Sequence, residues 1–232
     1  MIYWPLFIPP LGWVAYGMGA HLFTWNSVRH GSGGRRAIAL TFDDGPDPVH
    51  TPKVLRLLSR YEAQATFFLV GERAVAAPHV VKAIVEDGHE VGNHTWSHRN
   101  LWWSSPSRTR EEIVRGADVL GELTGGAVRH FRPPWGMVNL AVFPTLRRLG
   151  SRCVFWSIQP EGLRAAPPEI MARRVARKAH PGAIVDLHDA EGLPGAPLRL
   201  LAALPEMIER LRAEDYALVP LGELLSAREH NP

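Results

Sequence analysis

Cysteine is almost absent from this chain, which has a single one, Cys153, among 232 residues. One cysteine excludes an internal disulfide and any zinc site built from several cysteines. The residues that follow it, Val154-Phe155-Trp156, are apolar, so we expect a buried core cysteine. The 46% of hydrophobic and 21% of charged residues are typical of a globular protein, and the length suits one well-buried domain.

A large excess of charge of one sign is also missing. The 26 Lys and Arg residues against 23 Asp and Glu residues give a net charge of +3, and the basic residues are scattered along the chain. This pattern has no nucleic-acid-binding footprint, and we predict no nucleic-acid partner. Weak attraction to anionic lipid or to an envelope polymer is the most that this charge supports.

The first 28 residues contain no Lys, Arg, Asp or Glu. Their longest plausible helix, residues 11–25, is shorter than the roughly 20 residues that a spanning helix needs. A basic n-region is also missing, so a cleavable signal peptide fits poorly. We predict a membrane-associating segment over residues 1–28, either spanning or re-entrant; the alternative is an apolar arm packed on the domain. Residues 29–36, with three glycines, are predicted to be a linker to a domain over residues 37–232.

From Ala37 onward, short apolar runs alternate with amphipathic stretches. The predicted strands are Ala37–Phe42, Thr66–Val70, Glu90–His94, Val128–Arg132, Cys153–Ser157, Ala183–His188 and Ala217–Val219. The predicted helices lie near residues 51–61, 72–87, 107–123, 139–149, 167–179, 198–213 and 221–228. This alternation predicts an α/β fold with a parallel sheet covered by helices, either a barrel or a doubly wound sheet. In a barrel the carboxyl ends of the strands share one face, where catalytic sites are built.

The first motif is the run Thr41–Pro46, in which Asp43 and Asp44 follow a buried strand and a Gly-Pro pair follows them. Consecutive strand residues point to opposite faces of a sheet, so the two acids cannot easily share one role unless the strand ends between them. One can bind a metal ion while the other faces a substrate. The alternative is a turn that merely favours Asp and Gly.

The second motif is the run Asn93–His98, with His94 and His98 four residues apart. On one face of a helical turn this spacing brings two imidazoles close enough to hold one ion. A catalytic zinc typically has three protein ligands and an open position, and Asp44 would supply the third ligand. A histidine pair with this spacing is often incidental when it stands alone.

Two further motifs end later strands. In the run Phe131–Gly136, Arg132 is followed by two prolines that restrict the loop, and an arginine beside a carboxylate would keep that acid ionised. In the run Ile184–Asp189, His188 ends an apolar strand, which suits a proton donor or a further metal ligand. Taken singly, an arginine in a proline turn and a buried core histidine are the ordinary interpretations.

Together the four motifs resemble the polysaccharide deacetylase family, the NodB-like metal-dependent carbohydrate esterases that remove N-acetyl groups from sugar polymers. The resemblance covers roughly residues 35–225. It implies a distorted (β/α) barrel of about seven parallel strands around one divalent ion, with zinc expected first and cobalt, nickel or manganese as alternatives. The substrate that it implies is an amino-sugar polymer or oligomer, peptidoglycan- or chitin-like.

The resemblance also implies roles for single residues. Asp43 corresponds to the catalytic base, Arg132 to the residue that positions this base, and His188 to the catalytic acid. The metal ligands correspond to Asp44, His94 and His98. Trp135 stands where the family usually has Tyr, whose backbone N–H helps to hold the oxyanion. Leu187 and Trp156 are candidates for the apolar wall around the acetyl methyl group.

One stretch departs from the family's pattern. After the fifth strand the family usually carries an Asp that steadies the catalytic histidine, followed by an Asp-Trp pair; here Gln159 replaces the first acid and Gly162-Leu163 the pair. Asp186 is a carboxylate inside an apolar strand, and it should face the same side as His188 because strand side chains alternate. We hypothesise that Asp186 compensates for Gln159 by contacting His188 or Arg132. The alternative is that it caps a neighbouring loop or helix and has no part in turnover.

Other functions remain open at this point. The same site could act on a lipid-linked sugar or another amide, as a deacetylase or deformylase, or it could belong to a catalytically dead carbohydrate-binding module. For location, the resemblance implies the cell envelope, with the domain outside the cytoplasm. If the apolar segment spans a membrane, the basic residues just after it favour the cytoplasmic face instead.

Overall fold

The computed structural model describes residues 12, 16, 17, 19, 20, 24, 27–161, 166–192 and 194–226. Within these residues the chain forms one parallel sheet with strand order β5-β4-β3-β2-β1-β6, and β7 pairs with β1 beside this path. The strands are β1 Ala37–Asp43, β2 Thr66–Leu69, β3 Glu90–Asn93, β4 His130–Phe131, β5 Arg152–Cys153, β6 Ile184–His188 and β7 Ala217–Leu218. The predicted parallel α/β fold is confirmed, and every strand boundary lies within four residues of the predicted one.

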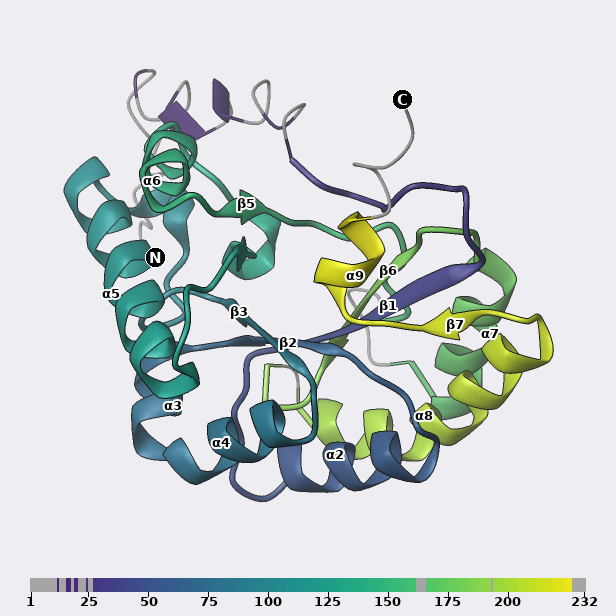
Figure 1. The fold of residues 1–232 in the computed structure, drawn as a ribbon. Helices are drawn as coiled ribbons and strands as arrows, with labels where there is room; N and C mark the ends of the chain where they lie inside the picture. The colour runs from purple at the N-terminus through teal and green to yellow at the C-terminus, as the bar shows by residue number, and fades with distance from the viewer. Residues whose placement is uncertain are drawn as a thin grey trace, which may run out of the picture.

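Helices cover the sheet (Figure 1). They are α2 Thr51–Arg60, α3 Gly71–Ala76, α4 Pro78–Glu86, α5 Pro106–Thr124, α6 Val142–Leu149, α7 Pro168–Lys178, α8 Ala196–Ala213 and α9 Leu221–Ser226, with short 3-10 turns η2 Leu101–Trp103 and η3 Pro134–Gly136. The single helix predicted over residues 72–87 is wrong: two helices meet there. Pro78 has no N–H and disfavours helical backbone at Ala77, whose φ and ψ are −134° and 57°.

The side chains of the central strand β1 alternate between the two faces of the sheet. Ile38, Leu40 and Phe42 pack in the large core that the sheet shares with the covering helices. The alternate residues Thr41 and Asp43 therefore face the opposite side of the sheet. Because all strands run in the same direction, the residues at their carboxyl ends meet at one edge of the sheet.

The two ends of the sheet path are joined through the residues that follow β5. Ser157 donates its N–H to the carbonyl of Ile184 (3.0 Å), and Ile158 accepts the N–H of Asp186 (2.9 Å), so this stretch bonds to β6. The strand predicted over residues 153–157 is thus a short pairing with β4 followed by an irregular crossing to β6. This crossing runs beside the first residues of β6 and brings Glu161 to His188 at the carboxyl end of that strand.

Several described residues of the apolar N-terminal segment pack on the domain. The carbonyl of Tyr16 accepts the N–H of Leu140 (3.3 Å), Ala20 is fully buried in a core cluster, and Val28 pairs in parallel with Val154. These contacts fit the alternative of a packed arm, and most of the segment lies outside the described residues. Among the residues that the structure describes, we find no helix with the length and apolar character needed to cross a membrane.

Candidate active site

The two adjacent carboxylates of the first motif separate because β1 ends between them. Asp43 is the last strand residue and is the register partner of His188 on β6. Asp44 has a φ of 73°, and this left-handed conformation turns the chain out of the strand. Both side chains are buried. A non-glycine residue in this conformation is strained, and such strain is commonly found at functional sites.

Asp44, His94 and His98, which we call the metal trio, converge on one point. The Oδ1 atom of Asp44 lies 2.9 Å from Nε2 of His98 and 3.4 Å from Nε2 of His94. One ligand atom from each residue lies within 4.8 Å of the other two. Ligand atoms about 3.3 Å apart are what a tetrahedral ion with bonds of about 2.0–2.1 Å requires. The donor set and the spacing therefore fit one divalent ion such as zinc.

Neighbouring groups prepare the trio for an ion. Nδ1 of His94 lies 2.7 Å from the carbonyl of Arg132, so it carries the proton and donates it there, which leaves Nε2 free as a ligand. Burial alone would raise the pKa of Asp44, but hydrogen bonds and charges from His94 and His98 hold this pKa well below its usual range. Asp44 is thus ionised, as a metal ligand must be.

The segment that carries both histidines is not a helical turn, and this part of the sequence prediction is wrong. Strand β3 ends at Asn93, and the left-handed residues Thr95 (φ 71°) and His98 (φ 52°) bend the following loop. The side chain of Asn93 accepts the N–H of Thr95 (2.9 Å), which competes with helical hydrogen bonding. The loop, rather than the helical spacing, brings the two imidazoles together.

Arg132 follows β4 and is fully buried beneath the site. Its Nη1 donates to Oδ1 of Asp43 (2.8 Å) and to the hydroxyl of Thr41 (2.7 Å), and it lies 3.4 Å from Oδ1 of Asp186. Its Nη2 donates to the carbonyl of Phe155 (3.1 Å). A buried guanidinium requires such compensation, and in return it fixes the orientation of the Asp43 carboxylate.

His188 has a carboxylate partner that the sequence analysis did not assign. Nδ1 of His188 lies 2.8 Å from Oε2 of Glu161, whose side chain is only 2% exposed. Glu161 is the one acid in the stretch from 154 to 165. This was the sequence signal that could have identified it as the partner of His188. Of the two contacts considered for Asp186, the structure contains the one with Arg132.

The acids around His188 change its protonation. Burial alone would lower the pKa of His188, but the charge of Asp186 and the hydrogen bond with Glu161 raise it to about 10. Burial, together with the charge of Asp43, displaces the pKa of Asp186 upward. His188 is therefore protonated at neutral pH.

Leu187 does not line the site, in contrast to the prediction. It is the register partner of Phe42, and both side chains are fully buried in the core between the sheet and the helices. Asp186 and His188 occupy the alternate positions of β6 and face the other side. Trp156 does approach the site: its ring centroid lies 5.6 Å from the guanidinium carbon of Arg132.

Trp135 lies at the open edge of the site. Its side chain is 58% exposed, and its ring centroid is 4.4 Å from that of His98. Its φ of 54° is left-handed, and the backbone hydrogen bonds of the turn run from Gly136 N–H to Pro133 and from Met137 N–H to Pro134. Neither of these bonds uses the N–H of Trp135.

Gly192 is a second residue that sequence reasoning missed. A Cβ atom added there would lie 2.2 Å from Oδ2 of Asp44 and 3.9 Å from Cδ2 of His188. The loop after β6 therefore approaches the metal trio so closely that any side chain at this position would collide with the Asp44 carboxylate.

Comparisons with known proteins agree with this geometry. Residues 30–154 match the family model described as polysaccharide deacetylase. A peptidoglycan-N-acetylglucosamine deacetylase of Bacillus cereus is 38% identical over 192 residues, which cover 82% of this chain and 88% of the relative. A chitooligosaccharide deacetylase of Azorhizobium caulinodans is 35% identical over 196 residues, covering 80% and 92% of the two chains.

Solved structures share the fold. The crystal structure of Bc1960, a peptidoglycan N-acetylglucosamine deacetylase, aligns with a TM-score of 0.82 at 29% identity and covers 94% of this chain and 97% of that one. BA3943 of Bacillus anthracis, described as a CE4 family pseudoenzyme, aligns with a TM-score of 0.77 at 27% identity, covering 85% and 68%. The fold alone therefore does not establish activity, which depends on the side chains of the site.

Proposed function

Since the chain belongs to the polysaccharide deacetylase family, we propose that it is a metal-dependent hydrolase that removes N-acetyl groups from an amino-sugar polymer or oligomer. The observation that carries this proposal is the joint presence of three units at one sheet edge. These units are the metal trio, the Asp43–Arg132 ion pair and the His188–Glu161 pair. Each unit supplies a different requirement of amide hydrolysis: an ion site, a base and an acid.

A divalent ion held by the metal trio would polarise the acetyl carbonyl and lower the pKa of a bound water toward about 7. Asp43 is the base. Its Oδ1 atom is held by Arg132 at 2.8 Å, whereas its Oδ2 atom lies 3.9 Å from Nε2 of His94 and faces the trio. Oδ2 takes a proton from water as the water oxygen bonds to the acyl carbon.

The leaving amine needs a proton, and His188 provides it. With Nδ1 bonded to Glu161, the imidazolium presents Nε2 as its donor. When the carbon–nitrogen bond breaks, Nε2 protonates the amine, and the products are acetate and a free amino sugar. The N–H of Trp135 would donate to the oxyanion, an interaction that contributes about 3–4 kcal/mol in such sites.

The names of the relatives support peptidoglycan or chitooligosaccharide as the substrate class, and we propose an N-acetylglucosamine polymer of the cell envelope. Action on such a polymer would place the domain outside the cytoplasm. Labelling the protein from each side of the membrane in intact cells tests this location, and labelling only from the cytoplasmic side would contradict it.

The activity test is acetate release from N-acetylglucosamine oligomers, measured together with metal content. The wild-type protein should bind about one ion and release acetate, and Asp43→Asn serves as the matched inactive control. Bound metal with activity only on other amides would favour a lipid-linked sugar or non-sugar substrate instead. Bound metal without any turnover would favour a dead binding module.

A further inference from the structure

The loop that carries the two histidines of the metal trio is attached to one turn of α5. Trp96 donates its N–H to the carbonyl of Glu112 (2.9 Å), and the side-chain amide of Asn93 donates to the carbonyl of Ile113 (2.9 Å). The loop itself contains two left-handed residues and lies outside regular secondary structure. Its conformation therefore depends on partners outside the loop.

Glu112 makes the most direct of these attachments. Its side chain is 1% exposed, and its two carboxylate oxygens accept the N–H and the hydroxyl of Ser97, each at 2.8 Å. Ser97 is the residue immediately before His98. The carboxylate thus accepts two hydrogen bonds, one from the backbone and one from the side chain of the residue that precedes His98.

The charge of Glu112 is compensated from one side. Nη2 of Arg108, one helical turn earlier, lies 2.9 Å from Oε1, and Nε of Arg99 lies 3.9 Å from the same oxygen. A buried carboxylate is costly without such partners. Both arginines contact Oε1, which also accepts the Ser97 hydroxyl, while Oε2 accepts the Ser97 N–H.

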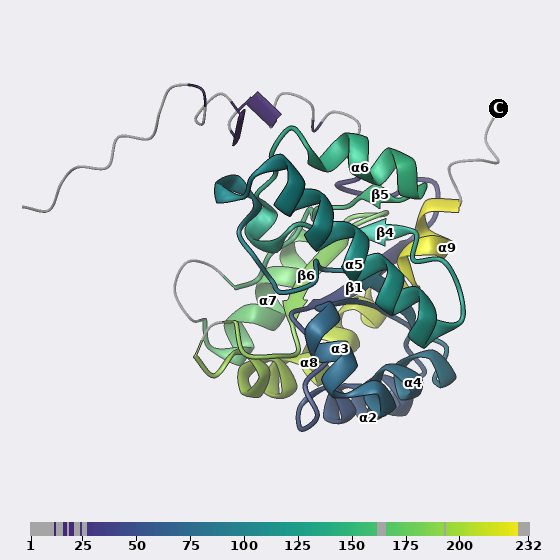
Figure 2. The same ribbon diagram turned by 90° about the vertical axis from the view of Figure 1, so that its left-hand side faces the viewer.

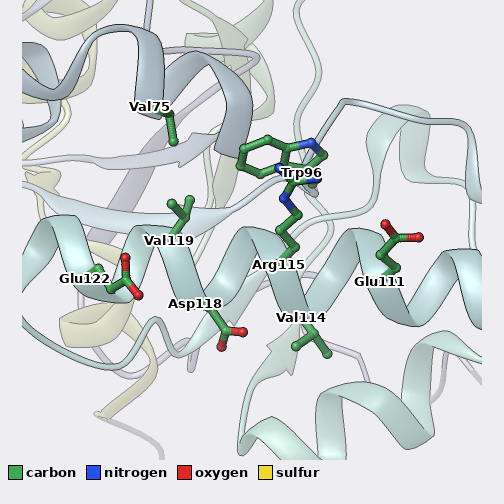
Figure 3. Close-up of a pocket in the computed structure, with 8 residues that line it drawn as sticks. All are labelled: Val75, Trp96, Glu111, Val114, Arg115, Asp118, Val119 and Glu122. Atoms are coloured by element: carbon green, nitrogen blue, oxygen red, sulfur yellow. The ribbon is translucent and has the colours of Figure 1, made fainter.

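The neighbouring residues of α5 fit the loop closely. A Cβ atom on Gly116 would lie 2.5 Å from Oδ1 of Asn93, so only glycine permits this approach. Arg115 places its guanidinium carbon 3.6 Å from the ring centroid of Trp96, and Figure 3 shows this side chain reaching up from α5 to the indole. Figure 2 shows α5 and α3 lying in front of the sheet at this side of the molecule.

From these contacts we infer that Glu112 is a positioning residue for the metal site: it fixes His98 through Ser97. This inference rests on the proposed metal site, but it concerns affinity for the ion rather than the reaction. Without the carboxylate, Ser97 loses one backbone and one side-chain hydrogen bond, and the 2.9 Å approach of His98 Nε2 to Asp44 is no longer enforced. Groups that orient metal ligands typically change metal affinity or activity by 10–100-fold when they are replaced.

The test is Glu112→Gln in the full chain, with Glu111→Gln as the matched control. The glutamine is nearly isosteric but has one acceptor oxygen, so it cannot accept from the Ser97 N–H and from Arg108 at once, because these two donors contact different oxygens of Glu112. Glu111 is the adjacent residue of α5, pairs with Arg108 at 2.9 Å and has an exposed side chain. The zinc dissociation constant is measured by competition with a chromogenic chelator, and the melting temperature of the metal-free protein is measured in parallel.

Glu112→Gln should weaken zinc binding by roughly 10-fold or more, while Glu111→Gln should bind zinc as the wild type does. Excess zinc should restore most of the acetate release of Glu112→Gln. A lowered melting temperature with an unchanged zinc affinity would overturn the inference, because it would show a structural role only. Weakened zinc binding in a protein that releases no acetate would support the inference and contradict the proposed function.

Discussion

Replacing Glu161 by Gln should lower the pKa of His188 while leaving its orientation intact. The wild-type histidine has a pKa raised to about 10 by the charge of Asp186 and by the hydrogen bond that Nδ1 donates to Glu161 at 2.8 Å. A hydrogen bond to a charged group contributes about 1.5–3 kcal/mol, and 1.36 kcal/mol corresponds to about one pKa unit. The variant's pKa should therefore lie near roughly 8 to 9. The glutamine oxygen can still accept from Nδ1, so the change is mainly one of charge.

The assay is the pH dependence of acetate release under saturating metal. In the proposed mechanism the protonated form of His188 is the acid, so its loss defines the alkaline limb, and a lower pKa moves this limb to lower pH. Near pH 7 the variant should keep kcat within a few-fold of the wild type, because its histidine remains protonated. At pH 9.5 it should be roughly fivefold to tenfold slower relative to the wild type, from the protonated fractions at pKa values of about 8.5 and 10.

The control is Gln159→Ala, an exposed position in the same stretch. It should leave the alkaline limb where it is. If Glu161→Gln leaves the limb in place as well, Glu161 does not set the protonation of His188, and the assignment of this pair to acid catalysis is wrong. Measuring the metal content of each variant separates this outcome from loss of the ion.

The other predictions address the remaining groups. Asp43→Asn should retain the metal and lose turnover by about 10²–10⁴-fold; loss of the metal with activity restored by added metal would make Asp43 a ligand. Replacing either histidine of the metal trio by Ala should remove most metal and most activity, and full metal occupancy in both variants would contradict the trio. Asp186→Asn should lower kcat and move the alkaline limb to lower pH, since the charge of Asp186 raises the pKa of His188; if neither changes, His188 works without it. Burial alone would raise the pKa of Glu90, but His130 at 2.5 Å and further hydrogen bonds lower it below 4.5. The free energy of unfolding should thus fall as the pH drops below about 4.5, and denaturant titrations of Glu90→Gln should show less of this loss.

The sequence by itself determined the parallel α/β class and the candidate chemistry. Short apolar runs separated by amphipathic stretches can be satisfied by a helix-covered parallel sheet, and parallel strands bring their carboxyl ends together. Acids, histidines and an arginine at such strand ends were therefore expected to meet before any contact was known. Asp44, His94 and Arg132 lie at the common edge for this reason.

The tertiary structure decided which side chains face the site and which residues contact one another. Leu187 and His188 are adjacent in the sequence, but the pleat of β6 puts one in the core and the other at the site. Which face is which depends on the strands and helices that pack on either side, and a run of five residues does not contain that information.

The residues that contact the candidate site residues could likewise not be predicted from local sequence patterns. Glu161 reaches His188 because the chain after β5 crosses to β6. Glu112 lies on α5, 15 residues after Ser97, and contacts the loop that carries His94 and His98. Glu161 and His188 are 27 residues apart, and Ser97 and Glu112 are 15 residues apart. Neither separation is one that brings two side chains together within a single helix or strand. In the unfolded chain, water solvates a carboxylate, and burying its charge is costly unless a partner is present. Such a carboxylate therefore becomes buried and paired only when the tertiary fold brings a distant segment against it.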